Sequence, residues 1–213
     1  MLSTRGRVLI GLAALVLVPM FFVPLWSITL SAPQYPEGLG MRIWLDAITG
    51  IKPNDLDNIN NLNHYIGMKR IEPDAIPELR YMPAIVGALV VVGLAAAAFG
   101  RRRLTQLWVG AFAVLALIGL VDFYRWEYDY GHNLDLENAI IRIPGMSYQP
   151  PLIGTKQLLN FRATSLPAAG AILAVISMGL GVAALVVDVR SQSRRPRPAS
   201  AAPNERRAVS LVA

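Results

Sequence analysis

Two polar stretches of the sequence, 31–81 and 122–165, contain the side chains best suited to hold a soft metal ion. Imidazole and thioether groups together suit Cu(I), and the chain has no cysteine that could add a thiolate. One histidine and one methionine stand four residues apart, so a helix that continues this far would place both on one face. We therefore expect copper as the only cofactor, with five candidate ligands: His64, Met68, His132, Met146 and Met41. The alternative is that the histidines are structural and the methionines fill the core.

The same stretches carry large aromatic side chains that could anchor a protein partner. Tyr and Trp are the usual anchors of protein interfaces, where a few residues carry about 2 kcal/mol or more each. Around position 128, aromatic residues alternate with acidic ones, which suits a protein surface better than lipid. We expect an extracytoplasmic or membrane partner to contact Trp44, Tyr65, Trp126, Tyr128 and Tyr130. The alternative is that these rings lie at the level of the lipid headgroups.

Few residues of these stretches point to catalysis. Four acidic residues between positions 127 and 137 could form acid–base pairs, but their spacing does not bring them together. Acidic side chains in such connections are usually solvated. The sequence contains no nucleophile-elbow motif and no phosphate-binding loop. We therefore expect that the protein is not an enzyme.

Four uncharged stretches must position the two polar ones. A helix needs about 20 apolar residues to cross the roughly 30 Å core of a bilayer. Ionisable groups inside a membrane usually mark ion paths and proton relays, and these stretches contain none. The sequence thus predicts a multi-pass membrane protein that is neither a pump nor a proton-coupled transporter. Its expected spans are about 8–30, 82–99, 104–121 and 166–187.

The distribution of charge predicts the orientation. The two ends of the chain and the short link at 100–103 hold eleven basic residues against two acidic ones, whereas the two long connections are richer in acidic residues. Lys and Arg stay on the cytoplasmic side, so we expect both termini in the cytoplasm and both long connections outside. The basic residues can meet anionic lipid headgroups. They form no stripe with interleaved aromatic residues, so we do not expect nucleic-acid binding.

These observations predict an all-α protein with one membrane domain, residues 1–189. The connections 31–81 and 122–165 are expected to pack into a small cap on the outer face. Within the cap, the spacing predicts short helices at 40–49, from about Asn54 to Gly67, and at 156–161. Residues 190–213 are rich in Arg, Pro, Ala and Ser, and we expect them to form a disordered basic tail.

Four long strings in the cap resemble a poorly characterised family of small four-helix bacterial membrane proteins. They are APQYPEGLGM (32–41), NINNLNHYIGMK (58–69), DFYRWEYDYGHNL (122–134) and PGMSYQPPLIG (144–154). Members of that family are encoded beside accessory proteins of nitrous-oxide reductase maturation, including copper-delivery lipoproteins. The resemblance covers residues 8 to about 185 and implies a place in the bacterial inner membrane and a link to denitrification.

Three functions follow as alternatives. The first is a membrane-anchored accessory or assembly protein that acts at the extracytoplasmic face and handles copper for an enzyme such as nitrous-oxide reductase. The second is a structural subunit of a respiratory or photosynthetic membrane complex. The third is a membrane enzyme that uses the carboxylates of the long connections. We expect the first.

Overall fold

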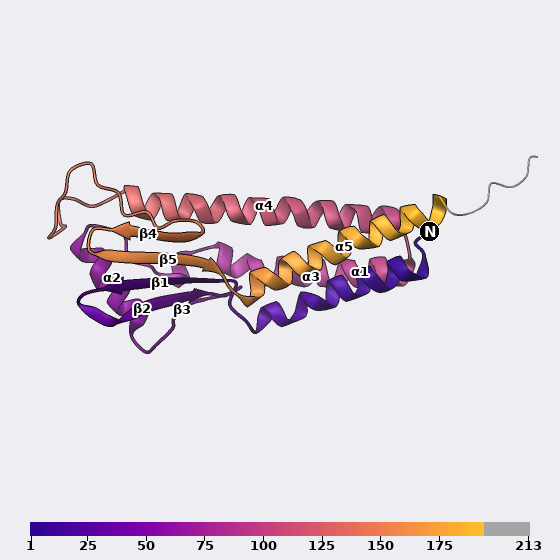
Figure 1. Cartoon of the computed structure of the whole chain (residues 1–213), viewed down its shortest axis with the longest axis horizontal. Helices are drawn as coiled ribbons and strands as arrows, with labels where there is room; N and C mark the ends of the chain where they lie inside the picture. Colours follow the sequence, from indigo (N-terminus) through magenta and orange to yellow (C-terminus); the bar gives the residue numbers. More distant parts are fainter. Residues whose placement is uncertain (194–213) are drawn as a thin grey trace, which may run out of the picture.

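The computed structural model describes residues 1–193, which form two parts joined end to end (Figure 1). One part is a bundle of long helices, and the other is a five-stranded sheet with a short helix beside it. One long helix runs through both parts. The long helices are α1 (Thr4–Val16), α3 (Glu78–Phe99), α4 (Arg102–His132) and α5 (Ala169–Ser193).

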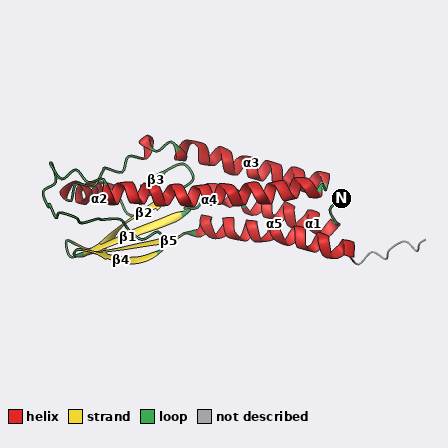
Figure 2. Cartoon of the chain, turned by 90° about the horizontal axis from the view of Figure 1, so that it is seen from above, coloured by secondary structure: helices red, strands yellow, loops and turns green. Residues whose placement is uncertain are grey.

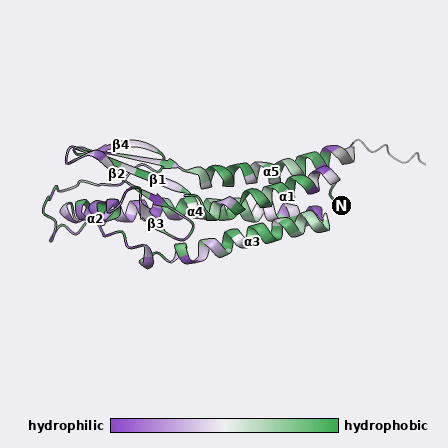
Figure 3. Ribbon diagram, turned by 90° about the horizontal axis from the view of Figure 1, so that it is seen from below, coloured by the Kyte–Doolittle hydropathy of each residue, from purple (hydrophilic) through white to green (hydrophobic). Residues whose placement is uncertain are grey.

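Four helices of the described residues are long and apolar enough to cross a membrane, which confirms the predicted multi-pass protein. The first candidate span continues from α1 through the 3-10 helix η1 (Val18–Phe21). Large apolar side chains cover the outside of the bundle, and Val91, Leu107 and Val175 are each about two-thirds or more exposed. Figure 3 shows this apolar colouring along the helices and more polar colouring around the sheet. Lipid is the medium in which such a surface is stable.

The bundle is built around α1 and closed by one tryptophan of α4. Trp108 is 1% exposed, and its Nε1 donates to the carbonyl oxygen of Leu89 on α3 at 2.7 Å. A Cβ at Gly93 would lie 3.0 Å from this indole, and a Cβ at Gly181 only 2.6 Å from it. Two glycines from α3 and α5 therefore leave the space that the ring fills.

Polar contacts tie the helices together at the end of the bundle that is far from the sheet. The backbone N–H of Ser3 donates to Asp188 at 3.0 Å, and Arg102 lies 3.6 Å from the same buried carboxylate. Arg7 donates to two carbonyl oxygens at the C-terminus of α3. These contacts bring the starts of α1 and α4 and the end of α5 to one level.

The sheet shows that the prediction of an all-α protein is wrong, because the described chain has a mixed α/β fold. All neighbouring strands are antiparallel, in the order β3-β2-β1-β5-β4. The strands of the first connection pair with those of the second through β1 and β5. Their bounds are β1 (Trp26–Ala32), β2 (Tyr35–Ile43), β3 (Ile48–Gly50), β4 (Gly154–Leu158) and β5 (Phe161–Pro167).

The error lies in the period of the apolar residues. Trp26 and Ile28 are buried in β1 while Ser27 and Thr29, which follow them in turn, are not, and this is the two-residue alternation of a strand. This segment is uncharged and follows an apolar helix, so it was counted as part of the span at 8–30. The helices expected at 40–49 and 156–161 are likewise strands and turns of this sheet.

One expectation for the first connection was correct. Helix α2 (Asp55–Tyr65) lies where a helix from about Asn54 was expected, and Gly67 follows its end with a φ of 77°. It lies beside β2, and a short 3-10 helix η2 (Pro73–Ala75) leads from it back to α3. Of the expected tail 190–213, residues 194–213 lie outside the described residues, and α5 extends to Ser193.

Helix α4 is much longer than a bilayer requires. Its 31 residues correspond to about 46 Å at 1.5 Å per residue, against a hydrocarbon core of about 30 Å. The uncharged part ends at Val121, and the rest of the helix runs alongside the sheet (Figure 2). We call residues 26–77 and 122–167 the sheet domain, which lies beyond the uncharged parts of the four long helices.

The orientation can be tested with single cysteines, because the chain has none of its own. A cysteine at exposed Ser31 in the sheet domain should react with a membrane-impermeant thiol reagent in intact spheroplasts. A cysteine at exposed Arg103, at the other end of the bundle, should react only after permeabilisation, because the distribution of basic residues predicts that this end lies in the cytoplasm. Labelling at Arg103 but not at Ser31 in intact spheroplasts would contradict the predicted orientation.

Candidate functional site

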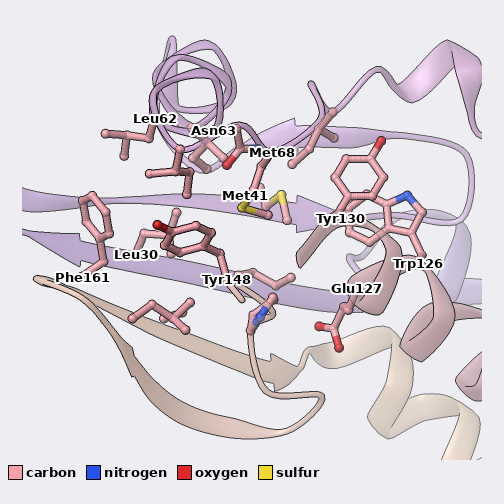
Figure 4. A pocket seen from close by; sticks show the side chains of 17 residues that line it. Leu30, Met41, Leu62, Asn63, Met68, Trp126, Glu127, Tyr130, Tyr148 and Phe161 are labelled. Atoms are coloured by element: carbon pink, nitrogen blue, oxygen red, sulfur yellow. The ribbon is translucent and has the colours of Figure 1, made fainter. Parts of the chain in front are cut away.

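A cavity of about 80 Å³ lies inside the sheet domain (Figure 4). Its walls come from β1, β2 and β5, from α2, and from the outer end of α4. Most lining side chains are apolar, among them Ile28, Leu62 and Phe161. Ligand sites in proteins usually combine such an apolar wall with a few polar groups. The polar groups of this cavity therefore indicate what it can hold.

The main polar group of the cavity is the carboxyl group of Glu127 on α4. Its side chain is 0% exposed, and neither carboxyl oxygen has a hydrogen-bond partner. Burial raises the pKa of Glu127 from 4.5 to about 8, because the charged form loses its hydration. A buried polar group without a partner is uncommon in folded proteins and costs free energy.

Asp129, the next acidic residue of α4, differs from Glu127 because its carboxylate has charged and polar partners. Asp129 forms an ion pair with Lys69 at 2.6 Å, and hydrogen bonds from Lys69 and Asn133 lower its pKa. Tyr130 also contacts the segment that contains Lys69, since its hydroxyl donates to the carbonyl oxygen of Arg70 at 3.2 Å. These contacts fix the outer end of α4 against the segment that follows α2. They place Glu127 firmly in the cavity wall.

The chain after α4 folds back over the helix and closes one side of the cavity. The backbone N–H of Tyr148 donates to the carbonyl oxygen of Gly131 at 2.9 Å. A Cβ at Gly131 would lie 2.4 Å from backbone atoms of Gln149, so only glycine permits this approach. Tyr148 is thereby buried in the cavity wall, where its hydroxyl has no hydrogen-bond partner and burial raises its pKa.

The structure divides the five candidate metal ligands into two groups. Met41 and Met68 both line the cavity, and Figure 4 shows their side chains pointing into it. His64 and His132 are exposed, and Met146 is half-buried. The ring of His132 stacks on Tyr128 at 3.9 Å, and its Nδ1 lies 3.0 Å from the carbonyl oxygen of that residue. Among the described residues, no group of three or more His, Cys, Asp or Glu could hold a metal ion.

The five aromatic residues expected to contact a partner also differ in how far they are exposed. Trp126 and Tyr130 lie with their ring centroids 4.2 Å apart and pack against the core of the sheet domain. Trp44 is half-buried between β2 and β3, where its Nε1 donates to Thr49 at 2.9 Å. Tyr65 and Tyr128 are 47% and 48% exposed. Only these last two, therefore, present a largely open surface to a partner.

The sequence contained a signal for the buried carboxyl group. Phe123, Trp126, Glu127 and Tyr130 recur at the spacing of one helix face. A continuous helix through this region would have placed Glu127 on the apolar side. The acidic residues were instead expected to be solvated, because the helix was expected to end near Val121.

The comparisons with known proteins identify no relative. No protein-family model matches this chain, and no curated protein or solved structure matches it. The fold and the site define its class only as a multi-pass membrane protein with an attached sheet domain that contains a cavity.

The carboxyl group predicts how stability depends on pH. The folded state of Glu127 keeps its proton up to about pH 8, whereas the unfolded chain releases it above 4.5. The stability from this group is therefore full at low pH and is lost as the pH rises through this range, by up to about 5 kcal/mol. Glu127→Gln should lack that loss. Its melting temperature should exceed that of the wild type at about pH 8.5.

Thermal unfolding of the purified protein in detergent would measure this difference across the pH range. Glu137→Gln is the matched control, because Glu137 is an exposed glutamate of the same domain. It should follow the wild-type pH profile. If Glu127→Gln and the wild type lose stability equally as the pH rises, the carboxyl group is not buried and protonated as described.

Proposed function

We propose that this protein is a membrane-anchored accessory or assembly protein that acts at the extracytoplasmic face through its sheet domain. The observation that carries this proposal is the cavity with the unpartnered Glu127 carboxyl group. The uncharged parts of the membrane helices offer no comparable group. A protein of this kind binds at its outer surface, and its helices hold the binding domain close to the membrane.

The charge distribution supports the proposed location. The basic residues gather at the end of the bundle opposite the sheet, which favours a bacterial inner-membrane protein with both termini in the cytoplasm. The sheet domain then faces the extracytoplasmic space. The partner in this proposal is another extracytoplasmic or membrane protein, such as a copper enzyme or a member of its maturation machinery.

Copper remains the metal that the donor atoms favour. Two thioethers in a largely apolar cavity suit Cu(I), and Met41 and Met68 would hold it there. The carboxylate of Glu127 would balance the charge of the ion. The exposed histidines and Met146 do not line the cavity, so the proposed ligand set is smaller than the one expected from the sequence.

The copper proposal can be tested by anaerobic titration of the full-length protein with Cu(I) against a competing chelator. The double variant Met41→Leu, Met68→Leu keeps the side-chain volume and should lose tight binding. Met146→Leu should bind like the wild type, because that residue does not line the cavity. Unchanged binding in the double variant, or loss of binding in a His64→Gln, His132→Gln variant instead, would contradict the proposed ligands.

The partner proposal rests on the exposed tyrosines. Alanine at both Tyr65 and Tyr128 should reduce copurification of the partner under mild detergent by at least about tenfold, because interface tyrosines often carry about 2 kcal/mol or more. Tyr81→Ala is the control, since Tyr81 is 64% exposed but lies at the start of α3. Equal loss in the control would contradict a specific surface. Copurification of a large multi-subunit complex would favour the structural-subunit alternative.

A further inference from the structure

The surroundings of Glu127 favour a ligand with a particular chemistry. Its carboxyl group is fully buried, has no hydrogen-bond partner, and lies in a cavity wall (Figure 4). Folded proteins satisfy nearly all buried polar side-chain atoms, and each exception needs an explanation. A ligand that donates hydrogen bonds to the carboxylate would supply the missing partner.

The aromatic side chains around the cavity narrow the class of ligand further. Trp126, Tyr130, Tyr148 and Phe161 all line it. The faces of aromatic rings attract cations, and Trp attracts them most strongly. A carboxylate and several aromatic rings in one cavity are the groups that recognise an ammonium ion.

The remaining walls and the size of the cavity describe the rest of the ligand. Aliphatic side chains such as Ile28, Leu30 and Ile71 complete the lining and suit a short hydrocarbon chain. An apolar cavity of about 150 Å³ holds benzene. The present cavity of about 80 Å³ therefore suits a smaller molecule.

We propose that the sheet domain binds a small organic cation, a short alkylammonium ion, whose charged group pairs with Glu127. The hydrocarbon chain of this ligand lies against the aliphatic wall of the cavity, and the aromatic rings flank the ammonium group. This activity goes beyond the accessory role proposed above and does not depend on copper binding. It assigns to the carboxyl group a direct contact with the ligand.

The test uses the purified full-length protein in nanodiscs and ethylammonium chloride as the probe, because ethylammonium is smaller than benzene. Isothermal titration at about pH 8.5 keeps the probe charged, because alkylammonium groups titrate near 10.4, and allows Glu127 to ionise. The wild type should give saturable binding. Ethanol has a similar shape but no charge, and it should bind at least about tenfold more weakly.

Two variants complete the experiment. Glu127→Gln should weaken ethylammonium binding by at least about tenfold while leaving the weak binding of ethanol unchanged, because only the charge pair is lost. Trp126→Phe keeps an aromatic ring and should weaken ethylammonium binding severalfold. Glu137→Gln should bind like the wild type.

Three results would overturn the proposal. They are absence of saturable binding of ethylammonium to the wild type, equal affinity of the wild type for ethylammonium and ethanol, and unchanged ethylammonium binding by folded Glu127→Gln. The second comparison uses only the wild-type protein, so the proposal can fail even if Glu127→Gln does not fold. The copper titration with the methionine variants is a separate measurement, and its failure would leave this result unaffected.

Discussion

One continuous helix, α4, belongs to both parts of the molecule, and the position of the cavity depends on it. Near its start, Trp108 fills the space that two glycines leave in the bundle. Near its end, Trp126 and Tyr130 pack against the core of the sheet domain, and Asp129 pairs with Lys69. A helix held at both ends transmits the position of the bundle to the sheet domain without a hinge. Glu127 therefore keeps a fixed place relative to the membrane.

A second connection joins the two parts at the base of the sheet. The backbone N–H of Leu25 donates to the carbonyl oxygen of Ile43, and the carbonyl oxygen of Leu25 accepts a bond from Ala168. Gly170, at the start of α5, donates to the carbonyl oxygen of Pro24, and a Cβ there would lie 2.8 Å from the Leu25 side chain. The short segment before β1 is thus bound to the sheet and to α5 together. Two separate attachments resist rotation of the sheet domain on the bundle.

The membrane helices could be predicted because lipid imposes one strong rule, the absence of charge over about 20 residues. The absence of charge does not show where a helix ends and an uncharged strand begins. The predicted first span, 8–30, therefore includes most of β1. The strands β1 and β5 also depend on each other although they lie far apart in the sequence. Helix α2 was predictable from local signals, such as its apolar spacing and Gly67.

The candidate site was only partly predictable for a similar reason. The thioether groups of Met41 and Met68 made them candidate metal ligands in the sequence, and both side chains line the cavity. Residue type did not reveal that His64 and His132 face solvent. The role of Glu127 depended on α4 continuing past the membrane, which hydropathy alone does not indicate. For the methionines, the histidines and Glu127 alike, contacts between segments far apart in the sequence determine where the side chain lies.

The pairing of β1 with β5 also sets an order of events during synthesis. The strands β1, β2 and β3 leave the membrane with the first connection, whereas β5 directly precedes α5. One edge of β1 has no partner until β5, and with it most of the described chain, has been made. Unpaired strand edges invite pairing with other chains. Biogenesis of this protein therefore includes a period in which the half-formed sheet must be protected from aggregation, while the cavity does not yet exist.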